Sequence, residues 1–340
     1  AIGEKALFYP NGELFVKFKP GTTFNDVLGF AQKRGLKPLS SLDFSPFVRV
    51  FELKAPSQRA LDAANGAHSS PFVEWAAPEF AHNVQKKFVP NDPLFPNQWH
   101  LRNVGQNGAT AGADVKADKA WDKTKGEGAV IAVVDDGVDC PHPDLAPNCL
   151  DGYDYVDDDD EPAPGEYDGH GTCVAGTAAA KGNDGIGVSG VCPECKIIPI
   201  RLLGEYLLTR DEANAFVFAV KNGAWVISNS WGVPDNNRAA VPIPKPTAEA
   251  VDYALNYGRG GLGTLVVFAA GNGSEPVNTD GYPAYKNSIA VAASDDQGIR
   301  SDYSDYGAEI EINAPSSGGI NGITTVDNAG SSGYSYGDYA

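Results

Sequence analysis

Three segments that lie far apart in the chain carry side chains suited to acyl transfer. One apolar run ends in Asp135, His170 opens a run of small residues, and a second apolar run is followed by Asn272. In such a set the carboxylate orients the imidazole, the imidazole takes the proton of a nucleophile, and the amide donates to an oxyanion. Each feature alone has a plainer explanation, because Asp-Gly and Asn-Gly are common turn dipeptides and a lone His is usually a surface or capping residue. Together they predict acyl-transfer chemistry.

The elements that would position these side chains belong to a parallel sheet. Short β-rich apolar runs alternate with helical stretches at residues 130–134, 197–203, 225–228, 265–269 and 289–292. Runs of this kind are typical of parallel strands that helices cover on both faces, and such folds bind ligands at the carboxyl ends of the strands. The small residues 174–180 predict a tightly packed helix with His170 at its start. We therefore predict a doubly wound, mostly parallel α/β fold.

The first part of the chain has a different pattern. Strand-like pieces are expected at 13–19, 47–53 and 72–75, and helix-like pieces at 24–34 and 58–64. This order predicts a small α+β domain of the ferredoxin-like βαββαβ kind. A polar linker that contains prolines follows at residues 81–98. We therefore expect two domains, residues 1–87 and residues 88–340.

The charge of the chain is strongly acidic and unevenly spread. Lys and Arg number 26 and Asp and Glu number 44, so the net charge is −18. Residues 1–87 have a balance of +3 and the remainder a balance of −21. Such a chain repels nucleic acid, and its apolar runs are shorter than the ~20 residues of a membrane span. Neither nucleic acid nor a membrane is expected as a partner, whereas metal ions and basic peptides are.

Four sequence blocks resemble those of the subtilisin-like serine proteases, the subtilases. They are VVDDGVD (133–139), DGHGT (168–172), SNSWG (228–232) and AAGNG (269–273). Other stretches are similar to the kexin/furin branch, the proprotein convertases: NDPLFPNQWHL (91–101), the doubled Asp135-Asp136, GRGGLG (258–263) and DGY (280–282). The resemblance covers about residues 91–340, whereas residues 1–87 are similar to a subtilase propeptide in layout only. It implies a calcium-dependent serine endopeptidase with an inhibitory and chaperone propeptide.

The resemblance assigns catalytic roles by position. Asp135 would be the triad acid, His170 the general base, and Asn272 the oxyanion donor. The backbone of an extended substrate would pair with an edge segment next to these residues. The residues implied for substrate binding at this edge are Ser230, Trp231, Gly232 and Gly271.

The nucleophile of the family does not occur in these residues. Subtilases place their Ser in a Gly-Thr-Ser-Ala-like block that opens a helix, and the Gly/Ser-rich stretch 316–340 contains no such block. We expect the chain to end before this block, so that a C-terminal segment or a second chain carries the Ser. A thiol nucleophile is not expected, because Cys173 lies on the wrong side of His170 for this architecture. An alternative function is a catalytically inactive module that binds basic peptides.

The resemblance also implies acidic substrate pockets. A basic side chain at the cleavage position would bind Asp235 and Asp280, and the preceding residue would face Asp136. Glu212 and Tyr282 would lie further out along the substrate. A carboxylate on a loop is by default a solvated turn residue, so the pocket interpretation depends on the positional match. These residues predict cleavage after Arg or Lys, including paired basic residues.

The linker contains a dibasic pair, Lys86-Lys87, just ahead of the second domain. Such a pair is usually a solvated surface feature. Its position, combined with the acidic pocket residues, predicts self-cleavage after Lys87. The chain's own propeptide would then act as an intramolecular inhibitor, because charge attraction favours its docking in the right register. The resemblance implies a secreted or periplasmic location.

Two groups of oxygen-bearing residues are candidate calcium sites, since Ca²⁺ takes about 6–8 oxygen ligands. The first matches the family's tight calcium site and comprises Asp92, Asp144 and Asp184 with carbonyls from Lys181, Ile186 and Val188. The second comprises Asp154, Asp159 and Glu161. An acidic run is usually a solvated loop, but a divalent ion would remove the repulsion between its carboxylates.

The five cysteines leave at least one thiol unpaired. Cys140 and Cys149 could pair in an oxidising compartment, and Cys192 and Cys195 could also pair. Cys173 would then be left over, in a buried position. Zinc is not expected, because the one CxxC sequence has no partner pair.

Overall fold

The computed structural model describes residues 8–53, 60–82, 88–235 and 239–340. The chain divides into two compact units, Ala1–Lys86 and Lys87–Ala340. The dibasic pair of the linker, Lys86-Lys87, lies outside the described residues. Within the described ranges, no helix is long and apolar enough to cross a membrane.

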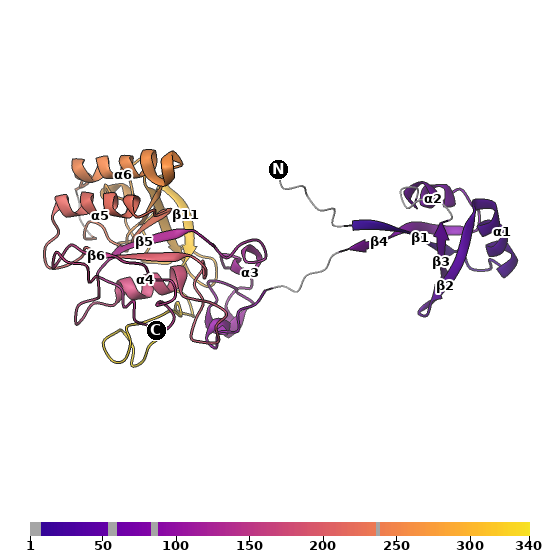
Figure 1. Cartoon of the computed structure of the whole chain (residues 1–340), viewed down its shortest axis with the longest axis horizontal. Helices are drawn as coiled ribbons and strands as arrows, with labels where there is room; N and C mark the ends of the chain where they lie inside the picture. Colours follow the sequence, from indigo (N-terminus) through magenta and orange to yellow (C-terminus); the bar gives the residue numbers. More distant parts are fainter. Residues whose placement is uncertain (1–7, 54–59, 83–87, 236–238) are drawn as a thin grey trace. The chain divides into compact units, whose positions relative to one another are not determined.

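The first unit is a four-stranded antiparallel sheet with two helices (Figure 1). Its elements are β1 (Phe8–Phe18), α1 (Phe24–Arg34), β2 (Leu36–Leu42), β3 (Ser45–Leu53), α2 (Ala60–Ala67) and β4 (Val73–His82). They follow the expected βαββαβ order, and the sheet order is β2-β3-β1-β4. No strand was expected at β2, because only its first residue is buried and the segment lacks an apolar alternation.

Helix α1 shows how local signals define an element of this unit. Thr23 and Asp26 form a reciprocal capping box at its start, and Gly35 ends it with a left-handed φ of 65°. These groups satisfy backbone donors and acceptors that a helix end would otherwise leave unpaired. The buried face of α1 contributes Phe30, which packs edge-on against Phe18 in the core of the unit. The helix therefore has the bounds expected from the sequence.

The second unit is built on a seven-stranded parallel sheet, in the order β11-β10-β9-β8-β5-β7-β6. The strands are β5 (Val130–Asp135), β6 (Tyr153–Asp154), β7 (Lys196–Arg201), β8 (Val226–Asn229), β9 (Leu265–Ala269), β10 (Ile289–Ser294) and β11 (Ile310–Pro315). The α-helices in the described part of this second unit are α3 (Ala117–Ala120), α4 (His170–Ala179), α5 (Thr209–Lys221) and α6 (Lys245–Tyr257). The predicted parallel α/β fold is confirmed, and β6 and β11 at the sheet edges are additional strands.

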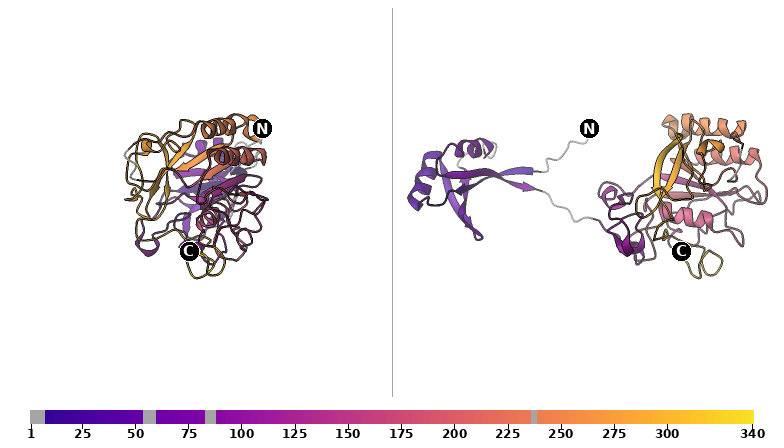
Figure 2. Two further views of the ribbon diagram at one scale, coloured as in Figure 1. Left: turned by 90° about the vertical axis from the view of Figure 1, so that its left-hand side faces the viewer. Right: turned by 180° about the vertical axis from the view of Figure 1, so that it is seen from behind.

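Helices lie on both faces of the central strands β5 and β7, with α5 and α6 on one face and α4 on the other (Figures 1 and 2). In β5, Ala132 and Val134 pack in the cluster formed with α5 and α6, whereas Val133 packs in the cluster formed with α4. Strand β7 alternates in the same way, with Ile198 in the first cluster and Ile197 in the second. Both faces of these strands are therefore buried, which is why their sequences are continuous apolar runs.

The segments that carry the candidate site lie together at the carboxyl edge of the sheet. Asp135 is the last residue of β5, and His170 is the first residue of α4. Ser230 follows β8, and Asn272 comes shortly after β9. The last segment, residues 316–340, contains no helix or strand and closes on itself through a bridge between Val326 and Tyr339.

Candidate active site

Asp135 and His170 form a hydrogen-bonded pair at the carboxyl edge of the sheet. Nδ1 of His170 lies 2.9 Å from Oδ1 of Asp135. Asp135 is 1% exposed at the end of its strand, whereas the side chain of His170 is 46% exposed at the start of α4. A bond at one ring nitrogen fixes the tautomer and the orientation of the ring. It leaves Nε2 of His170 as the nitrogen that can exchange a proton with another group.

The turn in front of α4 is anchored by Asp136. Its carboxylate accepts hydrogen bonds from the backbone N–H groups of Gly169, His170 and Gly171, at 3.2, 3.1 and 2.7 Å. Gly171 must be a glycine here, because a Cβ would lie 2.2 Å from the carbonyl oxygen of Gly137. Asp136 therefore holds the backbone of His170 in place. The contact predicted between Asp136 and the substrate stays a prediction.

The electrostatic surroundings of His170 favour its protonated form. The hydrogen bond to Asp135 raises the pKa of His170 above its usual value, burial lowers it, and the charges of Asp135 and Asp136 raise it further. The N–H groups at the start of a helix disfavour a nearby positive charge, and Asp136 offsets them. An imidazole in this setting can accept a proton and hold it, as a general base must.

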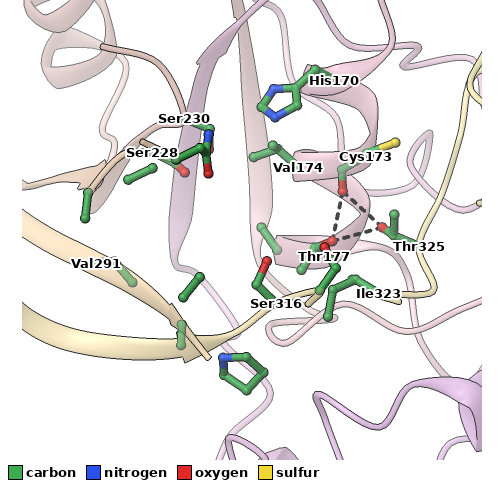
Figure 3. A pocket seen from close by; sticks show the side chains of 18 of the residues that line it. His170, Cys173, Val174, Thr177, Ser228, Ser230, Val291, Ser316, Ile323 and Thr325 are labelled. Carbon is green, nitrogen blue, oxygen red and sulfur yellow. Dashed lines mark hydrogen bonds between the residues drawn. The ribbon is translucent and has the colours of Figure 1, made fainter. Parts of the chain in front are cut away.

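His170 opens onto a cavity of about 670 Å³ (Figure 3). Helix α4 forms one wall with Cys173, Val174, Thr177 and Ala178, and the carboxyl ends of β8, β9, β10 and β11 form the others. Figure 3 places His170 and Ser230 at one end and Ile323 toward the other. Asn272 lines the same cavity. The structure thus brings Asp135, His170 and Asn272 to one site.

A serine is not bonded to His170 in the described part of the chain. Ser228, Ser230, Ser316 and Ser317 line the cavity. Within the described ranges, Nε2 of His170 has no hydrogen-bond partner; the bonds of this residue go to Asp135 and Asp136. The site therefore contains a base and its acid without a hydroxyl placed on the base.

The predicted edge segment lies beside the cavity. Trp231 points inward: its Nε1 donates to the carbonyl of Val134 at 3.0 Å, and its ring packs on Phe268 and Tyr282. Ser230 lines the cavity and Gly232 is exposed. Trp231 is therefore the anchor of the segment, and the residues on either side of it remain accessible.

Four carboxylates gather in a small pocket next to the edge segment. Asp235 and Asp280, both predicted for a basic side chain, line it together with Glu275, Asp305 and Gly271. Ligand oxygens of Asp235, Glu275 and Asp305 lie within 4.8 Å of one another, in the only such group of three found among the described residues. Such a group could hold one cation, either a metal ion or a basic side chain. The sequence offered no signal for Asp305, whereas Glu275 lies two residues after the AAGNG block.

Burial and mutual repulsion disfavour the ionised form of the carboxylates in this pocket. The pKa of Asp280 is raised, mainly by burial and also by Asp305 and Asp235. The pKa of Asp305 is raised by burial first, with Asp235 and Glu275 adding to it. The N–H groups of Val233 and Tyr282 donate to Asp280 and partly offset this, at 2.7 and 2.8 Å. A bound cation would relieve the remaining repulsion.

The outer pocket predicted from Glu212 and Tyr282 is wrong. Glu212 is 4% exposed and Tyr282 8%. The hydroxyl of Tyr282 donates to the carboxylate of Glu212 at 3.0 Å, and Thr247 Oγ1 donates to it at 2.6 Å. Buried carboxylates persist when hydrogen bonds satisfy them. These residues therefore join α5, α6 and the segment after Asp280 inside the core, and they are closed to substrate.

The first predicted calcium site has features that suit a cation. Asp92 accepts hydrogen bonds from three backbone N–H groups of the 181–188 loop, and Asp144 accepts one from Val188. Oδ1 of Asp144 is buried without a hydrogen-bond partner in the described structure. Burial raises the pKa of both Asp92 and Asp144, and the charge of Asp184 raises it further. An orphaned carboxylate oxygen on Asp144, together with the nearby charge of Asp184, fits an oxygen-seeking cation.

The second predicted calcium site, at Asp154, Asp159 and Glu161, stays a prediction, and Arg201 competes with an ion for Asp154. Asp154 is buried, and its Oδ2 accepts a hydrogen bond from Nη1 of Arg201 at 2.8 Å. Oδ1 of Asp154 accepts the N–H groups of Val156 and Asp157, and the carboxylate of Asp159 accepts the N–H of Glu161. The charge that a metal ion would supply comes from the guanidinium group.

The cysteines pair in the way that the sequence left open. Disulfides join Cys140 to Cys149 and Cys192 to Cys195. Cys173 is free, and it is half-buried in the cavity wall, not fully buried as expected. Burial raises the pKa of Cys173 to about 12. Its thiol is therefore protonated near neutral pH, which agrees with the expectation that it is no nucleophile.

Comparison with known families gives a match over most of the second unit. Residues 126–338 match the profile described as "Subtilase family" (Peptidase_S8). This match covers more than half of the chain.

Individual relatives agree with this match. The chain is 38% identical over 358 residues to the calcium-dependent protease of Trichormus variabilis, covering 99% of this chain and 52% of the relative. It is 34% identical over 251 residues to neuroendocrine convertase 2 of Drosophila melanogaster, covering 70% and 38%. The crystal structure of the Aeromonas sobria serine protease with its chaperone superposes with a TM-score of 0.67 at 26% identity, covering 74% of this chain and 48% of that one. The chain spans about half the length of the calcium-dependent protease that it matches.

Proposed function

Because the chain belongs to the subtilase family, we propose that it supplies the acid, base and oxyanion donor of a serine endopeptidase. The observation that carries this proposal is the 2.9 Å contact between His170 Nδ1 and Asp135 Oδ1, beside a cavity that Asn272 also lines. His170 takes the proton of a serine hydroxyl at Nε2 as the oxygen attacks the peptide carbonyl. Asp135 stabilises the imidazolium, and the amide of Asn272 donates to the oxyanion. His170 then passes the proton to the leaving amine.

The serine in this proposal comes from a C-terminal segment or a second chain, whose helix fills the cavity. The lining supports this occupant, since it is rich in small apolar residues such as Val174, Val267 and Val291. In β10, Ala290 and Ser294 are buried, whereas Val291 and Ala293 line the cavity and are only half-buried. Parallel sheets are covered on both faces, so a missing cover on this face calls for a helix. A serine at the start of that helix would meet Nε2 of His170.

We propose that the substrate carries Arg or Lys at the cleavage position. The support is the pocket of Asp235, Glu275, Asp280 and Asp305, which adjoins the edge segment and shares Gly271 with the cavity lining. A guanidinium or ammonium group there would neutralise carboxylates whose charges repel one another. The substrate backbone would pair with Ser230 and Gly232 on either side of the Trp231 anchor.

Calcium is proposed to bind at Asp92 and Asp144, with Asp184 and the carbonyls of the 181–188 loop. The name of the Trichormus variabilis relative, calcium-dependent protease, supports this assignment, as does the orphaned oxygen of Asp144. The ion would supply positive charge that links these carboxylates to the loop. It takes no part in the proton transfers, which belong to His170.

The first unit is proposed to act as an inhibitory propeptide that is cut after Lys87 in the secreted or periplasmic precursor. The charge balances of +3 and −21 on the two sides of this bond support docking of a basic segment on an acidic enzyme. In the active precursor, a new N-terminus should appear at Phe88, and replacing both Lys86 and Lys87 by Ala should prevent it. Cleavage at an unrelated linker bond would contradict the assignment.

The function is tested with a biotinylated phosphonate that ends in Arg and reacts with activated serines. The chain is co-expressed with a polypeptide that carries a Gly-Thr-Ser-Ala-like block at the start of a helix. We expect the label on that serine, and its loss in the His170→Ala variant. Cys173→Ser, a change in the same cavity, should keep the label. A label within these 340 residues, or labelling that is independent of His170, would overturn the proposal.

The same experiment separates the alternative, a catalytically inactive module that binds basic peptides. Such a module would bind an Arg peptide, as measured by calorimetry, without labelling any serine in the co-expressed polypeptide. The acidic pocket serves both functions, so the serine reaction decides between them.

A further inference from the structure

The turn that carries His170 has little internal restraint. Gly169 and Gly171 flank the histidine, and Gly169 provides no side-chain cap for α4. Glycine lowers the conformational cost of other backbone geometries, so a turn with two glycines needs contacts from outside to hold one geometry. Asp136 holds the backbone N–H groups of this turn from the side of β5. A second residue, near the C-terminal end of the sequence, also contacts this turn.

That residue is Asn328, from the irregular last segment of the chain. Its Nδ2 donates to the carbonyl oxygen of Asp168 at 2.5 Å, and its Oδ1 accepts a hydrogen bond from Thr172 Oγ1 at 2.6 Å. Asp168 and Thr172 lie two residues before and two residues after His170. One amide therefore bridges both ends of the catalytic turn.

The bridge is buried and closely packed. Asn328 is 4% exposed and Thr172 is fully buried. A Cβ on Gly169 would lie 3.3 Å from Nδ2 of Asn328, so the amide lies directly against the backbone of the turn. Water cannot easily replace buried hydrogen bonds of this kind, and their loss leaves polar groups unpaired.

The segment that carries Asn328 is itself fixed. Asp327 is fully buried, and its carboxylate accepts the N–H groups of Asn328 and Ser335 at 2.9 and 2.7 Å. Asp139 accepts the N–H of Ala329 at 2.9 Å, while its own N–H donates to Thr172 Oγ1 at 3.0 Å. The hydroxyl of Thr172 therefore connects the β5 side of the site to the last segment.

We propose that Asn328 is a positioning residue for His170, which holds the imidazole on Asp135 by bridging Asp168 and Thr172. A catalytic role for this positioning rests on the proposed function. The positioning itself concerns only the bond between His170 and Asp135. Loss of the bridge should loosen the turn and weaken the bond between His170 Nδ1 and Asp135. Thr172 is the second positioning residue, because its hydroxyl donates to the side-chain amide of Asn328.

The experiment is a histidine titration by NMR on the full 340-residue chain, with His170 assigned through the His170→Ala spectrum. Asn328→Ala and Thr172→Val remove the bridge, whereas Thr172→Ser keeps the hydroxyl. We expect the pKa of His170 to fall by about half a pH unit or more in the first two variants, and Thr172→Ser to restore the wild-type value. If Asn328→Ala does not fold, the pair of Thr172 variants gives the same test.

A matched control separates positioning from plain stability. Gln98 also binds the last segment, since its Nε2 donates to the carbonyl of Thr324 at 3.3 Å, but it makes no bond to the His170 turn. Gln98→Leu should lower the melting temperature and leave the His170 titration unchanged. The proposal fails if Asn328→Ala and Thr172→Val lose stability as Gln98→Leu does while His170 titrates as in the wild type. Because no nucleophile or substrate takes part, a failure of serine labelling would not affect this result.

Discussion

The carboxylate of Asp280 lies directly against the backbone of Gly232. A Cβ on Gly232 would lie 2.2 Å from Oδ2 of Asp280, which is closer than real contacts of this kind. The same oxygen accepts the N–H of Val233 at 2.7 Å. The glycine of the edge segment therefore allows the acidic pocket to form beside the substrate-binding backbone.

The first prediction concerns this contact. Gly232→Ala should push the Asp280 carboxylate away from Val233 and weaken binding of an Arg-containing peptide by about tenfold or more, the cost of one charge-assisted hydrogen bond. Asp280→Asn should weaken binding similarly, because it keeps the shape and removes the charge. Binding is measured by calorimetry at pH 7. Gly322→Ala is the control, since a Cβ there meets nothing within 4 Å, and equal binding by all four proteins would exclude a role for the pocket.

The second prediction concerns the pH dependence that His170 contributes. Its pKa is raised in the folded protein, mainly by Asp135. The folded state then binds the proton more tightly than the unfolded state, so this stabilisation is present below the ordinary histidine pKa and is lost as pH rises through the raised value. Asp135→Asn should remove the dependence and lower the His170 pKa. Denaturant unfolding from pH 6 to 9 gives the free energy of unfolding at each pH. The same pH dependence in the wild type and in Asp135→Asn would contradict the assignment. Asp151→Asn, at an exposed position, is the control.

The third prediction concerns His100, a buried histidine outside the site. It is 3% exposed, neither ring nitrogen has a partner among the described residues, and burial lowers its pKa to about 4. The unfolded state therefore takes up the proton first as pH falls from about 6.5, and stability is lost down to about pH 4. The shift corresponds to about 3 kcal/mol.

His100→Leu should remove this loss. The variant should be about as stable as the wild type at pH 7, because no hydrogen bond is broken, and more stable at pH 4.5. Urea unfolding at the two pH values measures the difference, and His68→Gln, at an exposed position in the first unit, is the control. An equal acid loss in the wild type and His100→Leu would show that other groups cause it.

The fourth prediction distinguishes the two candidate calcium sites. Calcium at about 100 times its dissociation constant should stabilise the wild type by about 2.7 kcal/mol, and Asp144→Asn should abolish most of that gain. Asp154→Asn breaks the ion pair with Arg201 and should destabilise the protein equally with calcium and with EDTA. Thermal unfolding in both conditions measures the effects. Loss of the calcium gain in Asp154→Asn, with its retention in Asp144→Asn, would reverse the assignment.

Sequence patterns were sufficient for elements that are buried on both faces or capped locally. Strands β5 and β7 lie where apolar runs predicted them, because a strand covered by helices on both sides is apolar at nearly every position. Strands β8, β9 and β10 were also predicted, although one side of each lines the cavity. Strands β2, β6 and β11 were not found in this way. They lie at sheet edges, where fewer side chains are buried and the apolar pattern fades.

The chain by itself determined the acid–base pair. Asp135 ends a buried strand and His170 begins a helix of small residues, and parallel topology brings both to one edge. Tertiary structure decided which other charges are available. Asp154 pairs with the guanidinium of Arg201, and buried Glu212 accepts the hydroxyl of Tyr282, from segments that no spacing connects, whereas Glu275 and Asp305 join Asp235 in one small pocket. The physical reason is that a carboxylate's role depends on its burial and on the donors around it, and those are fixed only when distant segments pack together.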